Sequence, residues 1–94
     1  MLFMVIERFR NSDATPIYRR FSEKGRMLPE GLRYVQSWVD VQRTRCFQVM
    51  ECEDPNLLTQ WQEKWKDLVE FEFIPVTSSQ AAQEQNGTPC NELR

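Results

Sequence analysis

Three segments of this sequence carry apolar side chains on both sides of an extended chain, which restricts the sheets that they can form. The segments are residues 2–9, 45–52 and 69–76. Side chains alternate across a strand. The two sides are Phe3 and Val5 against Leu2, Met4 and Ile6; Phe47 and Val49 against Cys46 and Met50; and Val69, Phe71 and Phe73 against Ile74 and Val76. A sheet built from these strands is apolar on both faces and has to be covered on both.

The sequence predicts two helices between the strands. In residues 14–28 apolar side chains recur at helical spacing, and Asp13 can accept hydrogen bonds from the first free amides. Residues 55–67 form the second predicted helix, with Asp54 as its cap and proline at its first position. The apolar stripe of this helix consists of Leu58, Trp61, Trp65 and Leu68.

The order of these elements predicts the fold. Residues 32–41 alternate as a half-buried edge strand does, and Pro75 argues for an edge position of the last strand, 69–76. Right-handed crossovers around the helices place the first and third strands in the centre. We therefore expect an α+β, ferredoxin-like β-α-β-β-α-β sandwich, a four-stranded antiparallel sheet with two helices on one face. It occupies residues 1–77, followed by a flexible or partly helical C-terminal tail, 78–94.

Two helices cover only one face of a four-stranded sheet. The other face would be an exposed apolar patch larger than soluble monomers usually carry. A second copy of the chain is the simplest cover, which predicts a homodimer joined through the sheet face as a dimeric α/β barrel. The alternative cover is the C-terminal tail folding back over the sheet.

The hairpin between the second and third strands predicts a register. Matched charges and matched aromatic rings face one another when the loop is centred on Gln42 and Arg43. The predicted pairs are Asp40 with Arg45, Trp38 with Phe47, Gln36 with Val49 and Tyr34 with Glu51 on one side, and Val39 with Cys46, Ser37 with Gln48 and Val35 with Met50 on the other. We expect the second, more aliphatic side to meet the helices.

The first side of this hairpin supplies the candidate ligand-binding residues, which are Tyr34, Trp38, Arg45, Phe47 and Glu51. An unpaired charge in a central strand is costly. Asp40 and Tyr34, or the partner chain, can therefore satisfy Arg45 and Glu51. The functional alternative is a pocket with aromatic walls, in which Arg45 binds an anionic group and Glu51 acts as an acceptor or weak base.

Composition narrows the possible chemistry. The chain of 94 residues contains no histidine, and its three cysteines, Cys46, Cys52 and Cys90, include no Cys-x-x-Cys pair. We therefore expect no metal site, no cofactor and no disulfide framework, and reduced thiols fit the cytoplasm. The apolar N-terminal run reaches Glu7 after six residues without a basic flank, which argues against a signal peptide and a membrane span.

Several stretches resemble a known family. They are Met1–Phe9, Tyr18–Phe21, Gly25–Leu32, Trp38–Asp40 and Arg45–Glu51, with further matching segments through the helix of Trp61 and Trp65 to Val76. Together they resemble the bacterial family of domains of unknown function numbered 3303, and the resemblance ends before the tail after Thr77. It implies a dimeric α/β barrel, in which two ferredoxin-like sheets pack face to face. It implies no activity and no catalytic residues.

Three functions remain open at the level of sequence. The first is a non-enzymatic dimeric protein that binds a small anionic or aromatic molecule near Arg45 and Trp38. The second is a cofactor-independent enzyme of the monooxygenase or isomerase type, in which Glu51, Tyr34 or Cys46 serves because histidine is absent. The third is RNA binding, which the net charge of −2 and the incomplete aromatic motif disfavour.

Overall fold

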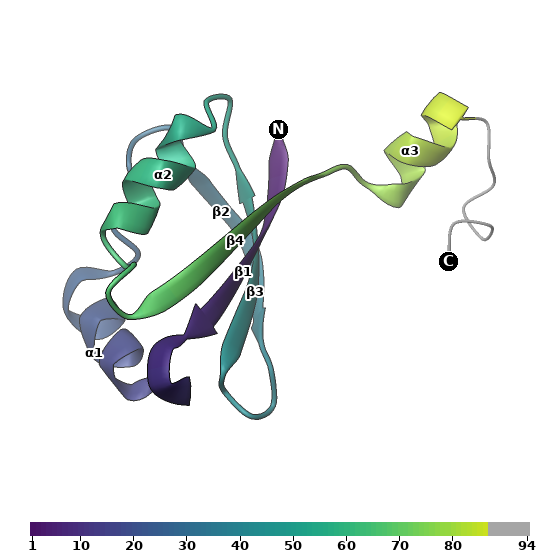
Figure 1. Ribbon diagram of the computed structural model, residues 1–94. Coiled ribbons are helices and arrows are strands. Elements are labelled where there is room, and N and C mark those ends of the chain that lie inside the picture. Colours follow the sequence, from purple (N-terminus) through teal and green to yellow (C-terminus); the bar gives the residue numbers. More distant parts are fainter. Residues whose placement is uncertain (87–94) are drawn as a thin grey trace.

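The computed structural model describes residues 1–86 and shows one sheet with helices packed on one side (Figure 1). Its elements are β1 (Leu2–Phe9), a 3₁₀ turn (Arg10–Ser12), α1 (Thr15–Lys24), β2 (Arg33–Val39), β3 (Arg45–Glu51), α2 (Asn56–Glu63), β4 (Val69–Val76) and α3 (Ser79–Asn86). The strand order is β2-β3-β1-β4, and every neighbouring pair is antiparallel. The α+β class and the ferredoxin-like arrangement of the sheet are confirmed, with β1 and β3 in the centre.

The core lies between the sheet and the helices α1 and α2, which cover the same face (Figure 1). Its residues come from alternate positions of the strands and from the inner sides of both helices. They are Phe3, Val5, Phe9, Ile17, Leu32, Cys46, Met50, Cys52, Leu58, Trp61, Trp65 and Val69. Val5 and Met50 have no exposed surface at all, so the two central strands form the most buried part of the molecule.

Both of these helices are shorter than the sequence predicts. The Asp13 carboxylate accepts a hydrogen bond from the Thr15 amide at 3.0 Å, and α1 ends at Lys24 because Gly25 takes a left-handed φ of 67°. The Asp54 carboxylate accepts from the Asn56 amide at 2.9 Å at the start of α2. After Glu63 the chain continues in turns as far as β4. The apolar stripe of α2 extends into these turns, which explains why the pattern predicts a longer helix.

The hairpin register is confirmed from Gln36 to Val39, but it changes at a bulge at Val35. Beyond the bulge, Tyr34 lies opposite Met50, and Arg33 lies opposite Glu51. The predicted pairs of Tyr34 with Glu51 and of Val35 with Met50 are therefore wrong. A bulge inserts one extra residue in one strand, so every side chain beyond it changes face.

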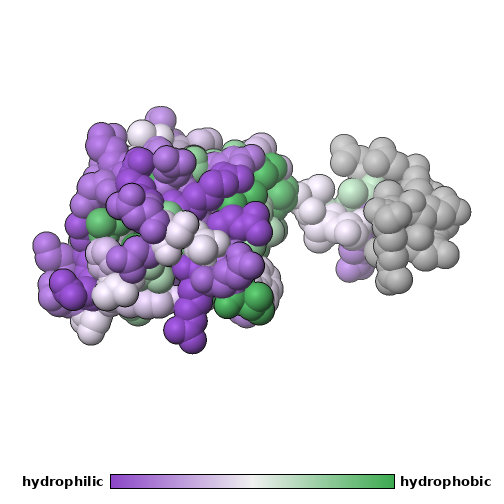
Figure 2. All heavy atoms as spheres, turned by 60° about the horizontal axis from the view of Figure 1, so that its bottom comes forward, coloured by the Kyte–Doolittle hydropathy of each residue, from purple (hydrophilic) through white to green (hydrophobic). Residues whose placement is uncertain are grey.

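The face of the sheet away from α1 and α2 is the open face, and it is rich in apolar side chains. Its apolar residues are Leu2, Met4, Ile6, Trp38, Phe47, Val49, Ile74 and Val76. Figure 2 shows apolar residues gathered on the right of the body, the side away from the two helices. As far as residue 86 the tail does not cover this face, because α3 stands away from the sheet at the end of β4 (Figure 1).

None of the helices within residues 1–86 combines the length and the hydropathy that crossing a bilayer requires.

Candidate functional site

A cavity of about 250 Å³ lies between the sheet and the helices, and we call it the helix-side cavity. It is lined by strands β1, β2 and β3, by α1 and the loop after it, and by α2 and the turns that follow. The lining residues are Glu7, Phe9, Ile17, Tyr18, Phe21, Arg26, Ser37, Val39, Cys46, Gln48, Trp61 and Trp65. Five of these side chains are aromatic, so most of the wall is apolar and a few polar groups converge on it.

Glu7 is the acidic residue of this wall. Strand alternation places Glu7 on the helix-side face with Val5 and Phe9, opposite Cys46 and Phe71 on the neighbouring strands. Burial raises the pKa of the Glu7 carboxyl from 4.5 to about 7, and the Arg26 guanidinium partly offsets the rise. The carboxyl therefore changes its charge near neutral pH, as the acid or base of an active site does.

Gln48 lies beside Glu7 on the adjacent strand β3. Its side chain is buried, with 4% of the residue exposed. The Gln48 Nε2 atom donates to Glu7 Oε2 across 3.5 Å. This distance is longer than the usual 2.7–3.2 Å of an N–H···O bond, so the two groups hold each other only weakly.

Arg26 is fixed at the cavity by the two tryptophans of its wall. Trp61 Nε1 and Trp65 Nε1 both donate to the Arg26 carbonyl oxygen, at 3.1 and 3.0 Å. The guanidinium lies over the ring of Tyr34, 3.7 Å from its centroid, and 5.0 Å from the centroid of Phe21. The backbone and the guanidinium of Arg26 thus contact four aromatic rings on one side of the cavity.

Cys46 also lines the cavity, but its thiol is not prepared for nucleophilic chemistry. Burial, together with the nearby Glu7 carboxyl, raises the pKa of Cys46 to about 12. Burial likewise raises the pKa of Cys52. The thiolate is the reactive form, so both thiols stay protonated and inert at neutral pH. Cys90 lies outside the described residues.

The structure divides the five residues that the sequence predicts as a binding site. Trp38, Arg45, Phe47 and Glu51 lie on the open face, with Arg45 and Glu51 at opposite ends of β3. Tyr34 does not join them, because the bulge turns it to the helix side, where its hydroxyl lies 2.7 Å from Ser37 Oγ.

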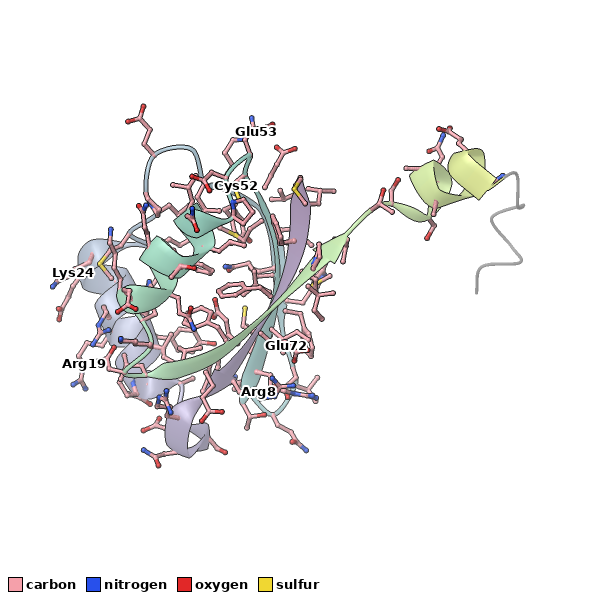
Figure 3. All side chains as sticks on the ribbon, turned by 45° about the horizontal axis from the view of Figure 1, so that its top comes forward. Arg8, Arg19, Lys24, Cys52, Glu53 and Glu72 are labelled. Carbon is pink, nitrogen blue, oxygen red and sulfur yellow. The ribbon has the colours of Figure 1, made fainter. Side chains whose placement is uncertain are left out.

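Neighbours within the chain satisfy the charges of the open face. Arg45 Nε donates to Asp40 Oδ2 at 3.4 Å, while its guanidinium lies 5.2 Å from the centroid of Phe47. Glu51 pairs with Arg33 instead of Tyr34. Arg8 and Glu72, 3.2 Å apart, project together on the side away from the helices (Figure 3). Charged groups therefore border the apolar part of this face.

Sequence reasoning missed Glu7, Gln48 and Arg26 as site residues. For the two strand residues a signal was present, because each is a polar residue at an inward position between buried neighbours. Glu7 follows Val5, and Gln48 stands between Cys46 and Met50. For Arg26 we find no such signal, since its position depends on two tryptophans from another part of the chain.

A family model described as a domain of unknown function (DUF3303) matches residues 1–87. The match continues past Thr77, where the resemblance was expected to end, and includes α3. A search of curated proteins finds no match to this sequence.

Proposed function

This chain belongs to the DUF3303 family, whose description names no activity, and we propose that it is a non-enzymatic protein that binds a small aromatic molecule in the helix-side cavity. The observation that supports this best is the composition of the cavity wall. Rings from Phe9, Tyr18, Phe21, Trp61 and Trp65 surround a few polar groups. Apolar walls with few convergent polar groups are typical of small-molecule sites.

The size of the cavity fits a ligand of one or two rings. Its volume is about 250 Å³. A cavity of about 150 Å³ lined by apolar side chains is enough to bind benzene. We therefore expect a compact planar ligand rather than an extended chain or a peptide.

The proposed protein is a homodimer in which the open faces of two copies pack together. Three observations support this assembly. The open face is apolar over β1 and β3, α3 does not cover it, and the charges at its border are already paired. In addition, the two outer strands are poor sites for edge-to-edge pairing, because β2 has a bulge at Val35 and β4 contains Pro75, which has no N–H.

A second candidate function is a cofactor-independent enzyme of the monooxygenase or isomerase type, and the properties of Glu7 favour it. A carboxyl with a pKa of about 7 can take and return a proton at neutral pH. In this version Glu7 takes the role that the sequence suggests for Glu51, Tyr34 or Cys46. Turnover of a bound aromatic compound, abolished in Glu7→Gln with binding retained, distinguishes the enzyme from the binding protein.

The three tryptophans allow a direct test of the binding site. Trp61 and Trp65 line the helix-side cavity, and Trp38 lies on the open face. We expect titration of the ¹⁵N-labelled protein with p-cresol to move the indole N–H signals of Trp61 and Trp65 in NMR spectra and to leave the Trp38 signal in place. Movement of Trp38 alone would instead support the site on the open face. No movement of any indole signal, with p-cresol, indole and p-toluate each tested at millimolar concentration, would contradict binding in the cavity.

A further inference from the structure

Building on the proposed binding in the helix-side cavity, we propose that the ligand is a phenol, whose hydroxyl is bound by both Glu7 and Gln48. The inference concerns the class of ligand, which the apolar wall alone does not define. It depends on the two polar side chains that lie side by side on β1 and β3.

These two groups bind each other weakly, so a third partner beside them can bind to both. Gln48 Nε2 and Glu7 Oε2 are 3.5 Å apart, too far for a strong hydrogen bond between them. A hydroxyl is both a donor and an acceptor. It can donate to the Glu7 carboxylate while its oxygen accepts from the Gln48 amide. Such a hydroxyl would replace one weak hydrogen bond by two ordinary ones, one of them to a charged group.

The charges around the cavity favour a neutral ligand over an ion. An anionic ligand would have to approach the Glu7 carboxylate, and a cationic ligand the Arg26 guanidinium. The Arg26 guanidinium already lies over the rings of Tyr34 and Phe21. These rings take up part of the surface that an anion would otherwise contact. A phenol brings no net charge, and its ring can pack against the aromatic wall.

The protonation of Glu7 then controls binding. Burial raises the pKa of Glu7 to about 7, so the carboxylate is the stronger acceptor above this pH. The other titratable or charged residues facing the cavity are Arg26, Cys46 and Tyr18, while β2, β4 and α2 face it with uncharged side chains. Cys46 keeps its proton because its pKa is raised to about 12. Affinity for a phenol should therefore rise by up to about tenfold from pH 6 to pH 8, as Glu7 ionises.

The test compares three small probes at pH 6 and pH 8 by NMR titration of the Trp61 and Trp65 indole signals. The probes are p-cresol, 4-methylanisole, which cannot donate a hydrogen bond, and p-toluate, which is an anion. We expect p-cresol to bind about tenfold more tightly than 4-methylanisole at pH 8 and to lose most of this advantage at pH 6. In Glu7→Gln the pH dependence disappears. Glu72→Gln, the same substitution on the open face, should leave it unchanged.

The possible outcomes separate this inference from the proposed function. If p-cresol and 4-methylanisole bind equally well at both pH values, the cavity binds aromatic molecules but the phenol assignment is wrong. If p-toluate binds most tightly, the polar group of the ligand is an anion near Arg26, and the assignment is again wrong. If the indole signals of Trp61 and Trp65 respond to none of the probes, both proposals fail.

Discussion

Glu7 is the residue in which the requirements of folding and of function conflict. Its neighbours in β1 on the same face, Val5 and Phe9, are buried core residues. An apolar side chain at position 7 would extend that core, whereas the carboxyl has to lose much of its hydration. Retaining such a partly buried group beside a small core is destabilising. We interpret it as a group kept for the ligand.

The cost of Glu7 should be visible in the pH dependence of stability. The pKa of Glu7 is about 7 in the folded protein, against 4.5 for an ordinary carboxyl. Between these values the folded state binds more protons than the unfolded state, so the free energy of unfolding falls as the pH rises from 4.5 to about 7. We expect Glu7→Gln to raise this free energy by up to roughly 3 kcal/mol at pH 8 and by little near pH 5.

Urea denaturation of both proteins at pH 5 and pH 8 measures this difference. Glu72→Gln serves as the control, because Glu72 is half-exposed and its substitution should change stability by a similar small amount at both pH values. An equal effect of Glu7→Gln at the two pH values would mean that the Glu7 carboxyl has an ordinary pKa in the folded protein.

At the level of helices and strands, the order and pairing of the elements could be predicted from sequence, and their ends only in part. The bounds of β4 agree with the prediction, since its β-rich run of residues 69–76 is distinct in sequence. The helix ends differ because apolar spacing continues into the turns after α2. The bulge at Val35 could not be predicted, since Tyr34 has an apolar ring and a polar hydroxyl and fits either face.

The candidate cavity shows the same limit of sequence reasoning. Strand parity alone could have assigned Glu7 and Gln48 to one face of the sheet. The position of Arg26 could not be derived, because it depends on how the loop after α1 meets Trp61 and Trp65. The predicted residues of the open face, in contrast, were derived from a hairpin whose register is largely correct. Their role in binding stays a prediction.

The contact between α1 and the turns after α2 depends on Arg20. Its guanidinium donates to both Asp67 oxygens, at 2.8 and 2.7 Å, and to the Lys64 carbonyl oxygen at 3.0 Å. It also lies 5.5 Å from the centroid of Trp65. Lysine cannot reproduce this two-pronged contact. We expect Arg20→Lys to lower the free energy of unfolding by about 1 kcal/mol, in line with exposed but bidentate pairs.

The matched control is Arg8→Lys, because Arg8 makes a single contact with Glu72 at 3.2 Å and both side chains are half-exposed. This substitution should change stability by only a few tenths of a kcal/mol. Chemical denaturation of both variants provides the comparison. Equal losses would show that the additional contacts of Arg20 do not stabilise the packing of the helices.

For the molecule as a whole, the main feature is the apolar open face, which a single copy of the chain leaves in contact with water. Val49 lies near its middle, between Met4 and Gln36 on the adjacent strands. Half-exposed aliphatic residues in the centre of a sheet gain stability when water is removed from them. Packing of the open face against that of a second copy would remove this water, and it would require no other segment of the chain.

A charge in the middle of this face should separate the two copies. We expect wild-type protein to have twice the mass of the 11.3 kDa chain in sedimentation experiments, and Val49→Lys to have the mass of one chain, because a buried unpaired ammonium is costly. Val41→Lys is the matched control, since Val41 is 99% exposed in the hairpin loop. A wild-type protein with the mass of one chain at micromolar concentration would contradict the proposed dimer.

The bulge at Val35 and the proline at position 75 have a consequence for the size of any assembly. Backbone hydrogen bonding could add further chains indefinitely to a sheet with regular outer strands, and this is how fibrils grow. Here β2 is interrupted by a bulge, β4 lacks the N–H of residue 75, and the helices occupy one of the two faces. Only one face is left for self-association, and a contact that uses the same face on both partners closes on itself. An assembly of this chain through the open face should therefore end after a single addition, at the proposed dimer.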